Sequence, residues 1–130
     1  AAIRVIAAGE PTLVHCTVGK DRTGVTVALA LSAVGADREA VIADYAMTES
    51  QLPAQRSQRI VAYLQAQHPE AVHAVALATQ SPAPVMRHLL EQVDERWGSA
   101  AGYLLAHGFG QDELDALIRT LVEPTGDSQS

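Results

Sequence analysis

The sequence predicts an α/β protein in which most of the chain is helical and one short strand leads into an apolar helix. Three observations support this prediction. Residues 12–15 form a short β-prone run that follows Gly9 and Pro11. Residues 25–34 are almost wholly apolar and rich in Ala and Leu, which favours a buried helix over a strand. Downstream of that helix, apolar residues recur at helical spacing and no second strand is indicated.

A parallel sheet needs at least two strands, because a lone strand leaves its backbone N–H and C=O groups unpaired. We therefore expect the partner strands to come from upstream N-terminal sequence or from a partner chain. In this interpretation residues 1–124 are the C-terminal portion of a single domain, and residues 125–130 are a flexible tail. The same reasoning predicts that residues 1–130 fold poorly alone, and a sharp, cooperative thermal transition would contradict that prediction.

Composition limits the classes of function. With 130 residues, 48% of them hydrophobic, the chain suffices for one domain with one core. Nine Lys and Arg residues against 15 Asp and Glu residues give a net charge of −6, which argues against nonspecific binding to nucleic acid. No apolar run approaches the ~20 residues of a transmembrane segment, and no signal peptide is visible, so cytoplasmic and secreted locations both remain open. The single cysteine excludes an intrachain disulfide.

The turn between the predicted strand and the apolar helix, residues 15–24, organises the candidate site. A turn from a strand into a helix directs successive backbone N–H groups into one concavity, which favours an anion at the helix N-terminus. Arg22 adds a guanidinium that can hold two phosphate oxygens at once. Helix N-termini and nearby cations also lower the pKa of a cysteine thiol from about 8.5 to roughly 3.5–7.5. We therefore expect Cys16 to be ionised at neutral pH and to act as a nucleophile toward phosphorus.

Two of these residues also have a purely structural interpretation. A single cysteine is more often a buried structural residue than a nucleophile, although the neighbours of Cys16 favour the nucleophile. Arg22 would otherwise be a surface arginine that begins a helix, where its charge opposes the helix dipole unless an anion is bound. Lys20 is expected to extend the positive field at the mouth of the loop and to meet a second phosphate, or else to be a solvated surface lysine.

The same residues resemble a known family. The pattern His-Cys, five residues and Arg-Thr at residues 15–23 resembles the signature of protein tyrosine phosphatases. Residues 19–24 resemble the atypical bacterial and fungal branch, which includes the secreted mycobacterial tyrosine and lipid phosphatase. A second resemblance, to the C-terminal helices of this branch, lies in Trp97-Gly98-Ser99, Tyr103-Leu104 and Gly108.

The resemblance implies the tyrosine-phosphatase fold, a parallel sheet wrapped by helices, with this chain forming mainly the helical C-terminal part and one central strand. It implies a cysteine-dependent phosphatase that hydrolyses phosphotyrosine in proteins through a cysteinyl-phosphate intermediate, with phosphoserine, phosphothreonine and phosphoinositides as further candidate substrates. Its partners would be phosphorylated proteins or phosphoinositides, and it would need no metal or cofactor. The alternative function is a catalytically silent phosphate-binding module of the same fold. A redox-sensing cysteine protein is a third interpretation of the same thiol.

The resemblance also implies roles for individual residues. Thr23 would hydrogen-bond the cysteine sulfur and help it leave as thiolate, unless it only caps the helix. His15 would orient the loop and perturb the thiol, or it is a satisfied buried histidine. Asp21 would protonate the leaving group and activate water, or it only pairs with a cation such as Lys20. The full catalytic set is Cys16, Asp21, Arg22 and Thr23, and the phosphate-binding set is Thr17, Val18, Gly19, Lys20, Asp21 and Arg22.

The rest of the chain is expected to be helical. Residues 54–79 read as a helical pair that, by resemblance, occupies the place of a lid over the active site; an ordinary helical hairpin is the alternative. Asp37, Ser99 and Asp112 are expected to cap the N-termini of three helices. Further helices are expected over residues 1–8, 38–48, 54–67, 71–79 and 81–97, and two more toward the C-terminus, the last ended by Pro124.

Overall fold

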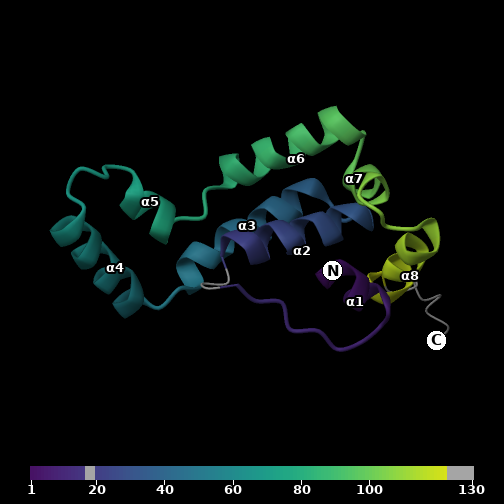
Figure 1. Ribbon diagram of the computed structural model, residues 1–130, viewed down its shortest axis with the longest axis horizontal. Coiled ribbons are helices and arrows are strands. Elements are labelled where there is room, and N and C mark those ends of the chain that lie inside the picture. Colours follow the sequence, from purple (N-terminus) through teal and green to yellow (C-terminus); the bar gives the residue numbers. More distant parts are fainter. Residues whose placement is uncertain (17–19, 123–130) are drawn as a thin grey trace, which may run out of the picture.

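The computed structural model describes residues 1–16 and 20–122, and within these ranges the regular secondary structure consists of helices (Figure 1). Predicted positions outside these ranges are residues 17–19 of the loop, Pro124 and the tail 125–130. The helices are α1 (Ala2–Ala7), α2 (Asp21–Ala33), α3 (Arg38–Gln51), α4 (Ala54–Gln67), α5 (Ala74–Thr79), α6 (Ala83–Trp97), α7 (Ala100–Ala106) and α8 (Gln111–Leu121).

Two of the three predicted caps are confirmed. The Asp37 carboxylate accepts the backbone N–H of Ala40 at 3.0 Å, and the Ser99 hydroxyl accepts that of Gly102 at 2.9 Å. These bonds satisfy N–H groups that the first turn of a helix cannot satisfy itself. The sharp stop of α6 falls on Gly98, whose φ of 79° suits a residue without a side chain.

The third predicted cap, Asp112, is wrong. A cap at Asp112 would start the helix at Glu113, whereas α8 begins two residues earlier, at Gln111, with Gly110 in the cap position, so Asp112 lies in its first turn. Glu113 supplies the capping interaction from inside the helix, because its carboxylate reaches back to accept the Gly110 N–H at 3.0 Å. The longer glutamate side chain spans the distance to a cap residue that has no side chain of its own.

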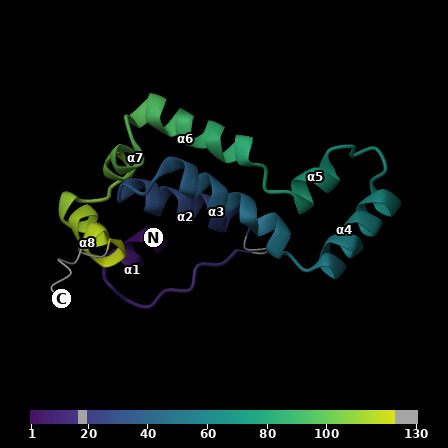
Figure 2. The same cartoon turned by 180° about the vertical axis from the view of Figure 1, so that it is seen from behind.

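Helix α2 joins two hydrophobic clusters, which places the start of α2 on a fixed support. Its residues Leu29 and Ala33 pack into a cluster with α1, α7, α8 and the end of α6. Its residue Ala28 packs into a second cluster with α3 and α6. Figures 1 and 2 show α2 between these helices from both sides. The second cluster contains Ala28, Val41, Ile42, Tyr45, Met86 and Leu90.

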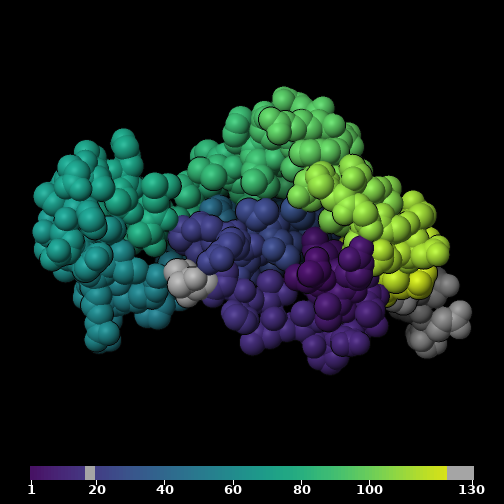
Figure 3. Space-filling model, viewed as in Figure 1, coloured from purple at the N-terminus to yellow at the C-terminus, as the bar shows by residue number. Residues whose placement is uncertain are grey.

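Helices α4 and α5 form a hairpin that stands apart from this body. Neither helix contains a buried residue, and each finds its main helix contact in the other. The space-filling view shows the hairpin as a separate lobe at one end of the molecule (Figure 3). The helical pair expected over residues 54–79 is therefore present, joined to the body through α3 and α6.

The predicted strand at residues 12–15 is not seen. These residues have no regular secondary structure, and Leu13 is 86% exposed rather than buried. A strand is stabilised by the ladder to its neighbour, and the described part of the chain contains no other strand to provide one. The helical part of the α/β prediction is therefore confirmed, whereas its sheet is not seen among the described residues.

Candidate active site

The predicted site residues gather at the start of α2. Lys20 occupies the N-cap position, and Asp21, Arg22 and Thr23 form the first turn, closed by the Gly24 N–H, which donates to the Lys20 carbonyl at 2.9 Å. The unsatisfied N–H groups and the dipole of this helix end favour an anion. Figure 1 shows that α2 begins at the end of the α2–α3 pair that faces the α4–α5 hairpin.

Cys16 precedes this turn by a short interval of the chain. It is half-buried and forms no disulfide, and His15 beside it is exposed. The expectation that His15 is a satisfied buried histidine is therefore wrong. Thr17, Val18 and Gly19, the residues predicted to supply loop amides to phosphate, lie outside the described residues.

Gly24 allows α3 to approach the start of α2 closely. A Cβ atom at this position would lie 2.8 Å from Cδ2 and 3.0 Å from Cε2 of Tyr45, closer than carbon atoms normally pack. Tyr45 is itself buried. Burial, followed by the nearby negative charge of Asp21, raises the pKa of the Tyr45 hydroxyl above its usual value of 10.0. The tyrosine therefore stays neutral and braces the first turn of α2.

Lys20 is neither a solvated lysine nor an ammonium that faces open solvent. Its side chain is buried, and its Nζ atom donates to the carbonyls of Leu77 at 2.9 Å and Gln80 at 3.0 Å. The third partner is the Asp21 carboxylate at 2.7 Å. The sequence does not predict these partners at the end of α5, because every residue has a backbone carbonyl and the residue type does not show which carbonyl Lys20 will bind.

Asp21 and Arg22 are exposed on the first turn of α2. The Asp21 carboxylate pairs with Lys20 through one oxygen, and its side chain remains 68% exposed, so a substrate has access to it. The pairing expected as the structural alternative for Asp21 is thus present, and it is compatible with a role in proton transfer. The Arg22 carbonyl accepts the Thr26 hydroxyl at 2.8 Å one turn further along α2.

The hydroxyl of Thr23 is unusual for a buried polar group. Its Oγ1 atom is buried and has no hydrogen-bond partner among the described residues. A buried polar atom without a partner costs about 1–3 kcal/mol, so such atoms are rare unless they serve a function. Neither predicted contact of Thr23 is seen in this structure: it lies inside α2 rather than at its cap, and its hydroxyl makes no hydrogen bond to the Cys16 sulfur.

A cavity of about 230 Å³ adjoins Lys20 and Asp21. Its walls are mostly apolar and come from α3, α5 and the start of α6. A second cavity, of about 180 Å³, lies beside Thr23 and Gly24 against α3. The first is lined by Lys20, Asp21, Tyr45, Ala76, Leu77, Gln80, Pro82 and Val85.

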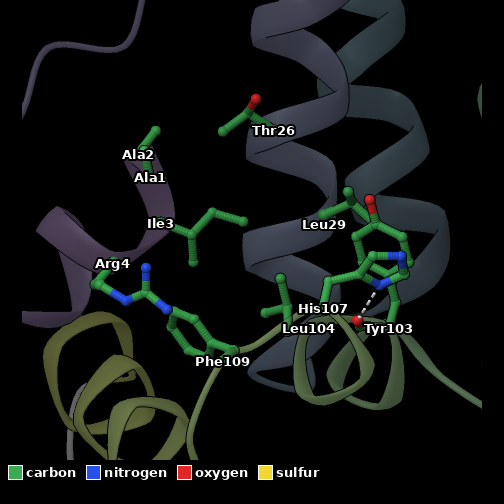
Figure 4. A pocket seen from close by; sticks show the side chains of 10 residues that line it. All are labelled: Ala1, Ala2, Ile3, Arg4, Thr26, Leu29, Tyr103, Leu104, His107 and Phe109. Carbon is green, nitrogen blue, oxygen red and sulfur yellow. Dashed lines mark hydrogen bonds between the residues drawn. The ribbon is translucent and has the colours of Figure 1, made fainter.

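The largest of these cavities lies elsewhere, between α1, α2 and α7, and holds about 270 Å³ (Figure 4). Arg4 and Phe109 line one side, and Tyr103 and His107 line the other, where His107 Nδ1 lies 2.8 Å from the Tyr103 carbonyl. None of the predicted site residues that the structure describes lines this cavity.

No group of three or more His, Cys, Asp or Glu side chains is arranged to hold a metal ion in residues 1–16 and 20–122. Among the same residues, no helix combines the length and the apolar character that crossing a membrane requires.

Comparison with known proteins identifies the family. Residues 1–123 match the tyrosine phosphatase family. The chain is 35% identical over 129 residues to the triple specificity protein phosphatase PtpB of Mycobacterium tuberculosis. The matched region covers 92% of this chain and 47% of that protein. It is 33% identical over 107 residues to a Cupriavidus necator protein named as a tyrosine-protein phosphatase, covering 78% of this chain and 37% of that protein. The chain thus spans about half the length, or less, of these relatives. The resemblance seen in the sequence is confirmed, and the chain belongs to the tyrosine phosphatase family.

Proposed function

We propose that the protein is a cysteine-dependent phosphatase that hydrolyses phosphotyrosine in proteins. Phosphoserine, phosphothreonine and phosphoinositides are its further candidate substrates. The observation that carries the proposal is the position of Cys16 four residues before Lys20, the N-cap of a helix whose first turn bears Asp21, Arg22 and Thr23, in a chain matched by the family over residues 1–123. The name of the mycobacterial relative, a triple specificity phosphatase, supports the wider range of substrates.

In the first step, the Cys16 thiolate attacks phosphorus. A bond forms between sulfur and phosphorus, and the bond from phosphorus to the ester oxygen breaks. The N-terminus of α2 and the forked guanidinium of Arg22 stabilise the charge on the phosphoryl oxygens, which is greatest in the transition state. Asp21, in its protonated carboxylic acid form, is the candidate acid that gives its proton to the leaving oxygen and becomes a carboxylate, because its side chain is exposed on the same turn.

In the second step, water attacks the phosphocysteine and gives up a proton to Asp21. The bond between sulfur and phosphorus breaks, inorganic phosphate leaves and the thiolate is restored. The Thr23 hydroxyl, which has no partner among the described residues, is suited to donate a hydrogen bond to the departing sulfur. His15 is the candidate for orienting the loop that carries Cys16. Thr17, Val18 and Gly19 are the candidates for contributing backbone N–H groups.

We also infer that residues 12–15 become a strand when they pair with a strand from outside residues 1–130. The exposed Leu13 side chain and the β-prone composition of this segment support the inference. The partner strand would come from upstream sequence or from another chain. In this arrangement residues 1–124 contribute the helical portion of a single phosphatase domain, and the strand leads into the loop that carries Cys16.

The proposal is tested by hydrolysis of an aryl phosphate with and without vanadate. We expect vanadate-sensitive turnover by the wild type and a loss of at least about a thousandfold for Cys16→Ser, since a serine hydroxyl is not ionised at neutral pH. Arg22→Lys keeps the charge but loses the fork, so its activity is expected to fall about a hundredfold or more. Arg119→Lys, an exposed arginine on α8, is the matched control and should retain full activity.

Two outcomes separate the alternatives. Phosphate binding without turnover in the wild type would establish the silent binding module instead. A Cys16→Ser variant that kept most activity would exclude the thiol as nucleophile. Comparison of phosphotyrosine peptides, phosphoserine peptides and phosphoinositides under the same conditions then ranks the candidate substrates.

A further inference from the structure

Lys20 connects the candidate phosphate loop to the far end of α5. Its side chain is 3% exposed, and its ammonium donates to the carbonyls of Leu77 at 2.9 Å and Gln80 at 3.0 Å, besides the Asp21 carboxylate at 2.7 Å. An ammonium has three hydrogens, so these three partners engage all of them. A phosphate oxygen can bind Lys20 only by displacing one of the three.

The two carbonyls are those that most need a cation. Leu77 lies in the last turn of α5 and Gln80 is its C-cap residue, where carbonyls lack helical partners and carry the negative end of the helix dipole. Because α5 has no buried residue, this contact is a substantial part of what holds its C-terminal end to the body.

One further attachment follows immediately in the chain. The buried Ser81 hydroxyl donates to the Ala46 carbonyl at 3.2 Å and accepts the Glu49 N–H at 3.0 Å, while the Ser81 N–H donates to the Glu49 carboxylate at 3.1 Å. This attachment reaches α3 and does not involve Lys20. The two contacts can therefore be removed separately.

We propose that the Lys20 ammonium is shared between α5 and the phosphate loop, so that an oxyanion bound in the loop draws it from the carbonyls of Leu77 and Gln80 and loosens the α4–α5 hairpin. Lys20 then acts as a positioning residue that couples anion binding to the docking of this hairpin. The inference rests on the proposed function, because it takes the loop to bind phosphate. The cavity of about 230 Å³ beside Lys20 gives the side chain room to turn without disturbing the core.

Amide hydrogen exchange of α5 measures this coupling, with inorganic phosphate as the probe. The amides of Leu77 and Gln80 donate to the carbonyls of His73 and Ala76, so their exchange reports on the integrity of α5. In the wild type, we expect exchange at residues 77–81 to rise about tenfold or more as phosphate is added, the order of effect of losing hydrogen bonds to a charged group. Protection of Cys16 from alkylation, followed in the same samples, reports how much phosphate the loop holds.

Two variants identify Lys20 as the link. Lys20→Met keeps the aliphatic stem and removes the charge. Its α5 amides should therefore exchange fast before phosphate is added, and the rate should not change when phosphate is added. Lys20→Gln is a second neutral variant. Ser81→Ala loosens only the contact to α3, so its exchange should start high and still rise with phosphate.

The outcomes decide the proposal separately from the function. If Lys20→Met and Lys20→Gln exchange at the wild-type rate, Lys20 does not hold α5. If phosphate protects Cys16 while the exchange of the α5 amides stays constant in the wild type, Lys20 remains bound to α5 whether or not phosphate is present, and the shared role is wrong. If phosphate never protects Cys16, the proposed phosphate site is wrong, and the shared role is wrong with it. The exchange rates of the two neutral variants still show whether Lys20 holds α5 to the body.

Discussion

Thr23 and Lys20 show how far residue types alone can locate a site. The spacing of Cys16 and Arg22 identifies the loop, because few functions place a cysteine and an arginine around a helix start. The burial of Lys20 was not predictable, since its partners are carbonyls 57 and 60 residues further along the chain. The sequence could not predict that the Thr23 hydroxyl is buried without a hydrogen-bond partner, because this is a property of the packed structure.

Replacing Thr23 with valine separates its catalytic role from its structural role. The change removes a buried hydroxyl that lacks a partner and keeps the shape, so the free energy of unfolding should stay constant or rise by up to about 1 kcal/mol. Release of the sulfur should slow, which would appear as a burst of leaving group followed by slower turnover. Thr26→Val is the control, because Thr26 bonds only the Arg22 carbonyl in its own helix. Equal kinetics for the wild type and Thr23→Val would refute the catalytic role.

At the scale of helices, local chemistry fixes the ends and tertiary contacts fix the rest. The caps of α3 and α7 followed from Asp37 and Ser99, since a cap acts within three residues. The start of α8 was missed by two residues, because Glu113 caps it from within. The strand predicted at residues 12–15 is not seen, because a β-prone segment forms a strand only when a neighbouring strand supplies the hydrogen-bond ladder, and a single segment does not show whether one is present.

The contact between α2 and α3 predicts an unusual response to a helix-favouring substitution. Alanine normally stabilises a helix by about 1 kcal/mol relative to glycine. At Gly24 the added Cβ would lie 2.8 Å from a buried Tyr45 ring carbon, so Gly24→Ala is expected to be destabilising, by about 1–2 kcal/mol after overpacking is included. In a Tyr45→Leu background the same change should become stabilising. Denaturant unfolding of the four proteins in this cycle checks the reversal of sign, and a stabilising Gly24→Ala in the wild type would contradict the contact.

Across the whole molecule, the first and last described helices are joined. Helix α1 packs against α8, and Arg4 pairs with Glu113 while donating to the Gly108 carbonyl at 2.9 Å. The hydrogen bond from Arg4, followed by that from the Gly110 N–H, lowers the pKa of Glu113 below its usual value of 4.5. A carboxylate with a lowered pKa in the folded state stabilises the fold above the pKa of the unfolded state, and that contribution disappears as pH falls through the folded value.

This linkage predicts a pH-dependent effect of Glu113→Gln. The variant should melt at a lower temperature than the wild type at neutral pH, and the difference should vanish as the pH falls below the folded pKa of Glu113. Because the pair is largely exposed, the difference should be small and should shrink with added salt. Melting temperatures across a pH series check this, with Glu95→Gln as the control on an exposed residue of α6. A difference that persisted unchanged at low pH would contradict the assignment.

The buried ammonium beside α5 has a practical consequence, because Lys20 is the only lysine among the 130 residues. Within residues 1–130, an amine-specific label can therefore modify no other side chain, and an endoprotease that cleaves after lysine has one target, four residues beyond the single cysteine of this stretch. With the side chain enclosed as it is, both reagents should work slowly on the native protein. Any treatment that exposes this one nitrogen becomes a direct, single-position signal of events at the start of α2.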